Sequence, residues 1–160
     1  MKKGILIIVV LIMLVIALGC TIFSVLTKEK VSITMQEFKT IMEEKGFSVG
    51  DATSQYSSYG YIDNAIIGMR NDRAYQIEFY TLSDDESAIY FYNTNKTIFE
   101  NSKSGATSQT TSELSNYSKY TLKCNNEYKV VSRINNTVVY INVEDTYEDE
   151  VKDILKEMGY

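Results

Sequence analysis

The chain has 160 residues, enough for one domain with a buried core, and it contains no histidine and no proline. Without histidine it lacks the side chain that titrates nearest neutral pH, which argues against Ser-His and Cys-His nucleophiles, most general-base chemistry and typical zinc sites. Of its 16 basic and 21 acidic residues, four and one lie in the first 30, so residues 31–160 carry a net charge of −8. That charge argues against nucleic acid as a partner, because such binding depends on Lys and Arg neutralising phosphates.

An uncharged apolar run of 22 residues begins at Ile5 and ends at Leu26. As a helix it would reach about 33 Å, enough for a hydrocarbon core of about 30 Å. We therefore predict that residues 1–30 are a membrane anchor with its tether and that residues 31–160 form one domain. Lys2 and Lys3 favour a cytoplasmic N-terminus, which predicts a single-pass protein of the cytoplasmic membrane with its domain outside.

A second interpretation of the same run is a lipoprotein signal. Residues 16–20, of sequence IALGC, resemble a bacterial lipobox, in which Cys20 would be lipidated and become the new N-terminus. The run stays largely apolar after Cys20, which favours a retained helix, and both interpretations place the domain outside the cytoplasm. The only other cysteine is Cys124, so no intramolecular disulfide framework is expected.

The first element after the tether is a predicted helix. Thr34 and Glu37 have the spacing of a capping box, and Gly46 is a suitable C-terminal stop. Residues 47–64 then lose periodicity and predict a polar loop. Its aromatic residues could stack on a sugar or a partner side chain, or fold back over the edge of the core: Tyr56, Tyr59 and Tyr61.

Residues 65–70 and 73–80 predict two strands joined by a two-residue turn. A capping box over residues 83–86 predicts a second helix reaching Phe99, and its adjacent acids suit a helix N-terminus better than a metal site. Residues 101–118 have no apolar period, so we expect a mobile excursion or an internal linker there.

The last third predicts a three-stranded antiparallel meander. Residues 119–124, 127–134 and 137–143 are separated by two Asn-Asn pairs, and Cys124 should pack inward. A final helix, capped by Asp145 or Thr146, follows to Met158. The fold class predicted is α+β: an N-terminal transmembrane helix, then one antiparallel sheet, hairpin plus meander, with about three helices on one face.

The second sheet face is then expected to be solvated or to meet a partner. The residues expected on it are Gln76, Glu78, Tyr80, Thr121, Lys123, Lys129, Val131 and Arg133, with Val138, Tyr140 and Asn142. A polar face carrying tyrosines is a reasonable interaction surface. The candidate interaction residues are Tyr56, Tyr59, Tyr61, Tyr80, Arg133 and Tyr140. No catalytic, cofactor-binding or metal-binding residue is predicted.

Residues 38–47 and 151–160 align without gaps as amphipathic helices closed by a glycine and an aromatic residue. This is either an internal duplication or convergence, because helices with a glycine cap and a hydrophobic contact commonly look alike.

The Met-Lys-Lys start, the apolar run and the abundance of Lys, Asn, Ile and Tyr carry one general resemblance. The chain resembles small, uncharacterised, membrane-anchored or lipoprotein-like extracytoplasmic proteins of Gram-positive bacteria with AT-rich genomes, a resemblance that assigns no functional residue. The leading hypothesis is a non-enzymatic interaction module that binds a protein or cell-envelope component. The alternatives are a histidine-independent enzyme that acts on envelope glycans through two carboxylates, and a membrane subunit or regulator of a larger complex.

Overall fold

The computed structural model describes residues 29–105 and 107–160. The predicted anchor over residues 5–26 and the possible lipidation site at Cys20 lie outside these described residues. No helix in the described ranges is both long enough and apolar enough to cross a membrane.

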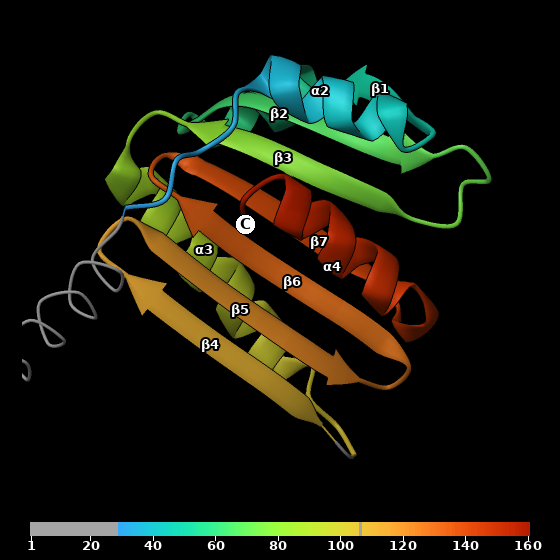
Figure 1. Cartoon of the computed structure of the whole chain (residues 1–160). Coiled ribbons are helices and arrows are strands. Elements are labelled where there is room, and N and C mark those ends of the chain that lie inside the picture. The colour runs from blue at the N-terminus through green and yellow to red at the C-terminus, as the bar shows by residue number, and fades with distance from the viewer. Residues whose placement is uncertain (1–28, 106) are drawn as a thin grey trace, which may run out of the picture.

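A single seven-stranded antiparallel sheet forms the centre of the domain, which confirms the α+β class (Figure 1). Its strand order is β1-β2-β3-β7-β6-β5-β4. The strands are β1 (Phe47–Asp51), β2 (Ile62–Arg70), β3 (Gln76–Leu82), β4 (Ser108–Leu114), β5 (Tyr117–Cys124), β6 (Glu127–Ile134) and β7 (Thr137–Glu144). The helices are α2 (Met35–Glu44), α3 (Asp85–Asn101) and α4 (Glu148–Glu157), with short 3-10 helices η1 (Thr53–Tyr59) and η2 (Asp145–Tyr147).

The predicted meander is confirmed in β5, β6 and β7. Asn125 and Asn126 have φ angles of 54° and 62°, and Asn135 has a φ of 49°. These left-handed conformations suit the tight turns between right-twisted strands, and asparagine tolerates them better than most residues do. Cys124 is buried, as expected.

Two strands form where the sequence predicts none. Strand β1 is short and has only Phe47 and Val49 as apolar residues, and β4 has no apolar alternation. The predicted loop over residues 47–64 contains β1 and η1, and the predicted linker over 101–118 contains β4, whose seven residues are all exposed. The first hairpin also differs from the prediction, since the residue with positive φ in its turn is Arg73, at 60°, and the turn is longer than two residues.

The prediction that all helices cover one face is wrong. Helices α2 and α4 cover one face, here called the α2/α4 face, whereas α3 lies behind the sheet on the α3 face (Figure 1). The strand register also moves two residues from their expected face: Thr121 is opposite Val130, and Lys123 is opposite Tyr128. Because Val130 and Tyr128 belong to the core beneath α4, Thr121 and Lys123 lie on the α2/α4 face.

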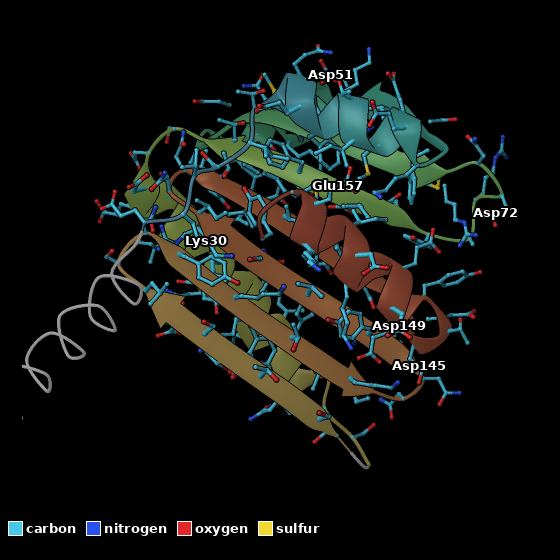
Figure 2. All side chains as sticks on the ribbon, in the orientation of Figure 1. Lys30, Asp51, Asp72, Asp145, Asp149 and Glu157 are labelled. Carbon is cyan, nitrogen blue, oxygen red and sulfur yellow. The ribbon has the colours of Figure 1, made fainter. Side chains whose placement is uncertain are left out.

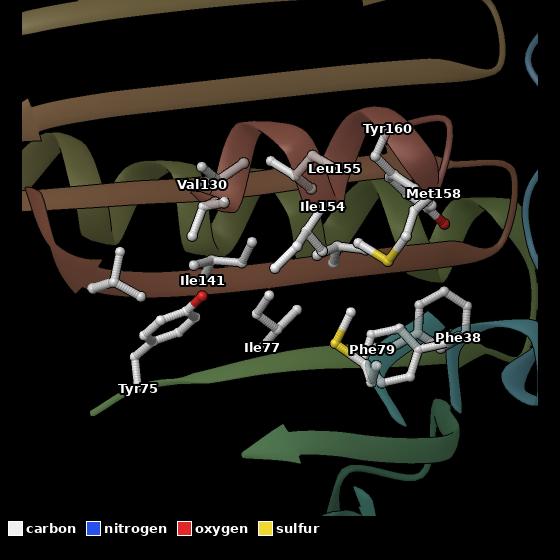
Figure 3. Packing of buried hydrophobic residues seen from close by; sticks show 14 of the residues in the cluster. Phe38, Tyr75, Ile77, Phe79, Val130, Ile141, Ile154, Leu155, Met158 and Tyr160 are labelled. Atoms are coloured by element: carbon white, nitrogen blue, oxygen red, sulfur yellow. The ribbon is translucent and has the colours of Figure 1, made fainter. Parts of the chain in front are cut away.

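The α2/α4 face holds the larger core (Figure 3). Phe38 of α2 stacks on Phe79 of β3 with ring centroids 5.1 Å apart. Helix α2 lies so close to β2 that a Cβ added at Gly68 would be 2.9 Å from Cγ of Met42. At this contact α2 and β2 are therefore packed without room for a methyl group.

The capping prediction for α2 is confirmed, since both halves of the Thr34–Glu37 box are present. Helix α3 is capped by Asp84, whose carboxylate accepts a bond from the amide of Ser87, and not by the predicted Ser83. Neither predicted cap of the last helix is present, because η2 precedes α4 and Tyr147 stands at its N-cap without a side-chain bond.

The two similar helices, α2 and α4, lie on the same face and end alike. Gly46 and Gly159 have φ angles of 80° and 82°, and a buried aromatic residue follows each of them. The Lys45 ammonium lies 2.6 Å from the Glu157 carboxylate, and this ion pair links the C-terminal ends of the two helices. These shared features fit both origins, so the duplication stays a prediction.

Candidate functional site

A cavity of about 220 Å³ lies between η1, α3 and the α3 face of the sheet. We call it the tyrosine hollow. Its lining residues are Tyr56, Tyr59, Tyr61, Ile62, Glu78, Tyr80, Phe91, Thr94, Asn95, Ile98 and Tyr140. The hollow lies beside α3 because that helix packs mainly over β6 and β7, so that the β3 side of this face is covered only in part.

Aromatic rings that contact one another build its walls. Tyr56 of η1 meets Tyr80 edge-on, with the planes at 90° and the centroids 5.3 Å apart. Phe91 of α3 also contacts Tyr80, with the ring centroids 4.8 Å apart. Because Tyr80 is buried and contacts both rings, it holds a loop residue and a helix residue in a fixed relation to the sheet.

Glu78 is the only charged residue in this lining. One carboxylate oxygen accepts a hydrogen bond from the side-chain amide of Gln76 at 2.6 Å, and the other accepts a hydrogen bond from the Tyr80 hydroxyl. A hydroxyl has one proton and the carboxylate only accepts, so the Tyr56 hydroxyl, 3.0 Å from that of Tyr80, donates to Tyr80. Burial, then the adjacent Glu78 charge, raise the pKa of Tyr80 far above its usual value, so Tyr80 stays protonated and does not act as a base.

A second, wider hollow of about 530 Å³ continues along the same sheet face and shares Glu78 and Tyr140 with the first. Glu127 and Glu144 lie in it at directly paired positions of β6 and β7. Lys129, which is largely buried, contacts Glu127 at 2.8 Å and offsets part of that charge. Glu127 and Glu144 therefore lie side by side on the sheet that forms the floor of the wider hollow, and they do not face each other across it.

The structure brings five of the six predicted interaction residues into the tyrosine hollow: Tyr56, Tyr59, Tyr61, Tyr80 and Tyr140. Arg133 does not join them, because it is buried beneath α3 at 3% exposure. Its guanidinium donates to the main-chain oxygens of Asn135 at 3.2 Å and Ser115 at 3.5 Å. Arg133 is thus a structural residue at the end of the sheet and offers no surface to a partner.

Sequence reasoning missed the contribution of α3. The helical residues of the lining are Phe91, Thr94, Asn95 and Ile98. Their spacing of three and four does indicate one helix face, but the sequence gives no local signal of which sheet face that helix covers. Glu78 was placed on the expected open face, yet nothing in the sequence set it apart from its neighbours as the acid within an aromatic cavity.

The tyrosine hollow presents several aromatic rings together with one carboxylate. Ring faces and edges attract apolar and cationic groups, and a carboxylate among them adds a fixed negative charge. In residues 29–105 and 107–160, no cluster of three or more cysteine, aspartate and glutamate side chains is placed to hold a metal ion.

Comparisons with known proteins leave the function open. No protein-family model matches the chain, and no curated protein sequence matches it. Among solved structures, a GTP binding regulator from Thermotoga maritima is similar at a TM-score of 0.46 and 15% identity, covering 79% of this chain and 88% of that one. A similarity at this level supports no functional argument.

Proposed function

We propose that the protein is a non-enzymatic binding module, tethered to the outer face of a cytoplasmic membrane by residues 5–26, with the tyrosine hollow as its ligand site. The support for the anchor is the length and lack of charge of that segment. The observation that carries the binding role is the carboxylate of Glu78 at the floor of a cavity whose walls are largely aromatic.

The ligand class that fits best is a small organic cation, or an alkylammonium group carried by a cell-envelope component or a protein. Aromatic rings bind such groups through their quadrupole, and an anion behind the rings strengthens the attraction where water is partly excluded. The net charge of −8 on residues 31–160 adds a long-range field that attracts cations and repels anions.

Neither alternative has a specific observation in its favour. A glycan hydrolase needs two carboxylates flanking the bond that is cleaved, whereas the tyrosine hollow has one, and the paired acids of the wider hollow share a floor. A role as a membrane subunit would depend on residues 5–26 as the binding element, and exchanging that segment for an unrelated transmembrane helix would then abolish function.

Location is tested by membrane fractionation followed by protease treatment of whole cells. The full-length chain should sediment with membranes, and added protease should digest the domain while a cytosolic marker stays intact. Recovery of the chain in the cytosol, or protection of the domain under conditions that digest a known surface protein, would overturn the tethered location.

Ligand class is tested by titrating the full-length protein in nanodiscs with tetramethylammonium, read by NMR of isotope-labelled tyrosine rings. We expect saturable shifts of Tyr56 and Tyr80 and a loss of affinity of about tenfold in Glu78→Gln, because that variant removes the charge and keeps an acceptor oxygen. Glu113→Gln, a change at an exposed glutamate of β4, is the matched control and should bind normally. Equal shifts in both variants, or none in the wild type, would refute the cation site.

A further inference from the structure

Lys30, the second described residue, is held firmly against the domain. Its amide donates to the Asn116 side chain at 3.2 Å, and that side chain donates back to the Lys30 carbonyl at 2.7 Å. Its ammonium donates to the Gly159 carbonyl at 2.7 Å and lies 3.9 Å from the centre of the Tyr117 ring. The chain is therefore docked onto the domain from Lys30 onward.

Hydrogen bonds show which end of the sheet receives this segment. The Asn135 amide donates to the Asn116 carbonyl at 2.9 Å, in the turn beside Lys30. The Leu82 amide donates to the Asn136 carbonyl at 2.8 Å, and the Ser83 amide donates to the Tyr61 carbonyl at 3.1 Å. The start of β2, the end of β3 and the start of α3 thus lie at the same end as Lys30, which we call the tether end.

Most of the large apolar side chains that are exposed lie at the tether end. Among the described residues, six large hydrophobic side chains are classed as exposed: Val31, Tyr59, Ile89, Tyr90, Ile98 and Leu114. All except Ile98 lie at the tether end, next to Lys30, in η1, in the first two turns of α3, or at the end of β4. Tyr59 and Tyr90 are 54% and 59% exposed and both contact the ring of Tyr61, at centroid distances of 6.0 Å and 5.8 Å.

We propose that the tether end rests on the bilayer surface, with Tyr59, Tyr90, Ile89, Leu114 and Val31 in the interfacial layer. This inference rests on the membrane anchor of the proposed function. Only three residues separate Leu26 from Lys30, and a fully extended chain over that interval reaches about 14 Å, so the tether end cannot move far from the membrane. Tyrosine prefers the membrane–water interface because its ring is apolar and its hydroxyl remains hydrated.

The charges at the tether end indicate which lipid surface fits. Asp84, Asp85 and Glu86 stand at the start of α3, beside Tyr90. Together with Asp63 at the start of β2 they outnumber the ammonium of Lys30, so this end would be repelled by anionic headgroups and is compatible with zwitterionic ones. The contact is therefore an apolar and zwitterionic one, and it should weaken as the fraction of anionic lipid rises.

The absence of tryptophan from the sequence allows a direct test. Tyr90→Trp and Tyr59→Trp each place one tryptophan at the tether end, and Asp72→Trp places one at the opposite end (Figure 2). Each full-length variant is reconstituted in vesicles of phosphatidylcholine with or without brominated acyl chains. We expect bromine to quench the first two about twofold and to leave the third nearly unchanged, and replacing half of the lipid with phosphatidylglycerol should reduce the quenching.

The quenching experiment tests the orientation of the domain separately from its anchor. Unquenched tryptophan at both tether-end positions, in protein that floats with the vesicles, would overturn the inference and leave the anchor intact. Equal quenching at the two ends would overturn it as well. Failure of the protein to float with vesicles would refute the anchor and, with it, this orientation. Circular dichroism and the urea midpoint of each variant establish that the fold is retained.

Discussion

The two faces of the sheet are built from the same strands but are used differently. On the α2/α4 face, two helices close a continuous core in which Phe38, Ile77 and Ile154 are almost fully buried. On the α3 face, a single longer helix covers one side, and the remaining surface holds the tyrosine hollow and the wider hollow beside it. The comparison shows how a small domain obtains stability from one face and leaves a shaped, partly polar cavity on the other.

The largest expected effect comes from truncating one aromatic residue on each face. Phe38→Ala should lower the free energy of unfolding by about 3–5 kcal/mol, because it opens a cavity in the α2/α4 core. Phe91→Ala should cost only about 1 kcal/mol, because Phe91 is half-buried at the wall of the hollow. Urea unfolding followed by circular dichroism measures both, and equal losses would contradict the division between the faces.

A smaller effect is expected from adding one methyl group to each face. Gly68→Ala would push its Cβ to 2.9 Å from Met42, and overpacking of this kind costs about 1–3 kcal/mol. Gly50→Ala, in the neighbouring strand, has no atom within 4 Å of the added Cβ, so its unfolding free energy should change by less than about 0.5 kcal/mol. Urea midpoints of the pair give the comparison, and a neutral Gly68→Ala would mean that α2 packs less tightly than described.

The smallest expected effect concerns Lys119, a lysine whose charge the fold disfavours. Burial, and then the charges of Lys30 and Lys152, lower the pKa of Lys119 on the α2/α4 face to about 8. Between pH 8 and pH 10.5, Lys119 is protonated more fully in the unfolded chain than in the folded one. The free energy of unfolding should therefore rise with pH over this window, and below pH 8 this gain should be missing.

Above about pH 10 stability should fall again, because burial raises the pKa values of Tyr92 and Tyr160 and only the unfolded chain then releases their protons.

Lys119→Met should remove the rise in unfolding free energy that the lysine causes. We expect that rise to be about 1 kcal/mol between pH 7.5 and 9.5 after allowing for partial exposure. Unfolding free energies at those two pH values test it, with Lys39→Met on the exposed side of α2 as the control. A wild-type stability that does not change over this range would refute the prediction.

Local signals in the sequence predicted local structure well. The Thr34–Glu37 box, the glycine that ends α2 and the Asn-Asn turns all depend on residues within one turn of each other, and each is confirmed. Strand β4 has no such signal, because its polar residues form a strand only by pairing with β5. The position of α3 depends on the path of the connection from β3 to β4, which no short window of sequence contains.

The same reason explains what could be foreseen of the hollow. The sequence indicates five tyrosines as candidate contacts, and all five line one cavity. The special position of Glu78 follows from the registration of β3 against β7, where Glu78 is opposite Tyr140, and from the covering helix. Arg133 alternates along its strand as predicted but is buried, because the helix that covers it cannot be inferred from the strand's own sequence.

Strand β4 forms one outer margin of the described sheet, and half of its backbone amides and carbonyls therefore point away from β5. Such margins are commonly guarded by lysine, proline or a bulge, because they otherwise act as templates for adding a strand from another molecule. Here the only charged side chain is Glu113, and Lys96 stands 3.5 Å from it. This margin therefore presents a backbone template to which a strand of a second copy can add at high protein concentration.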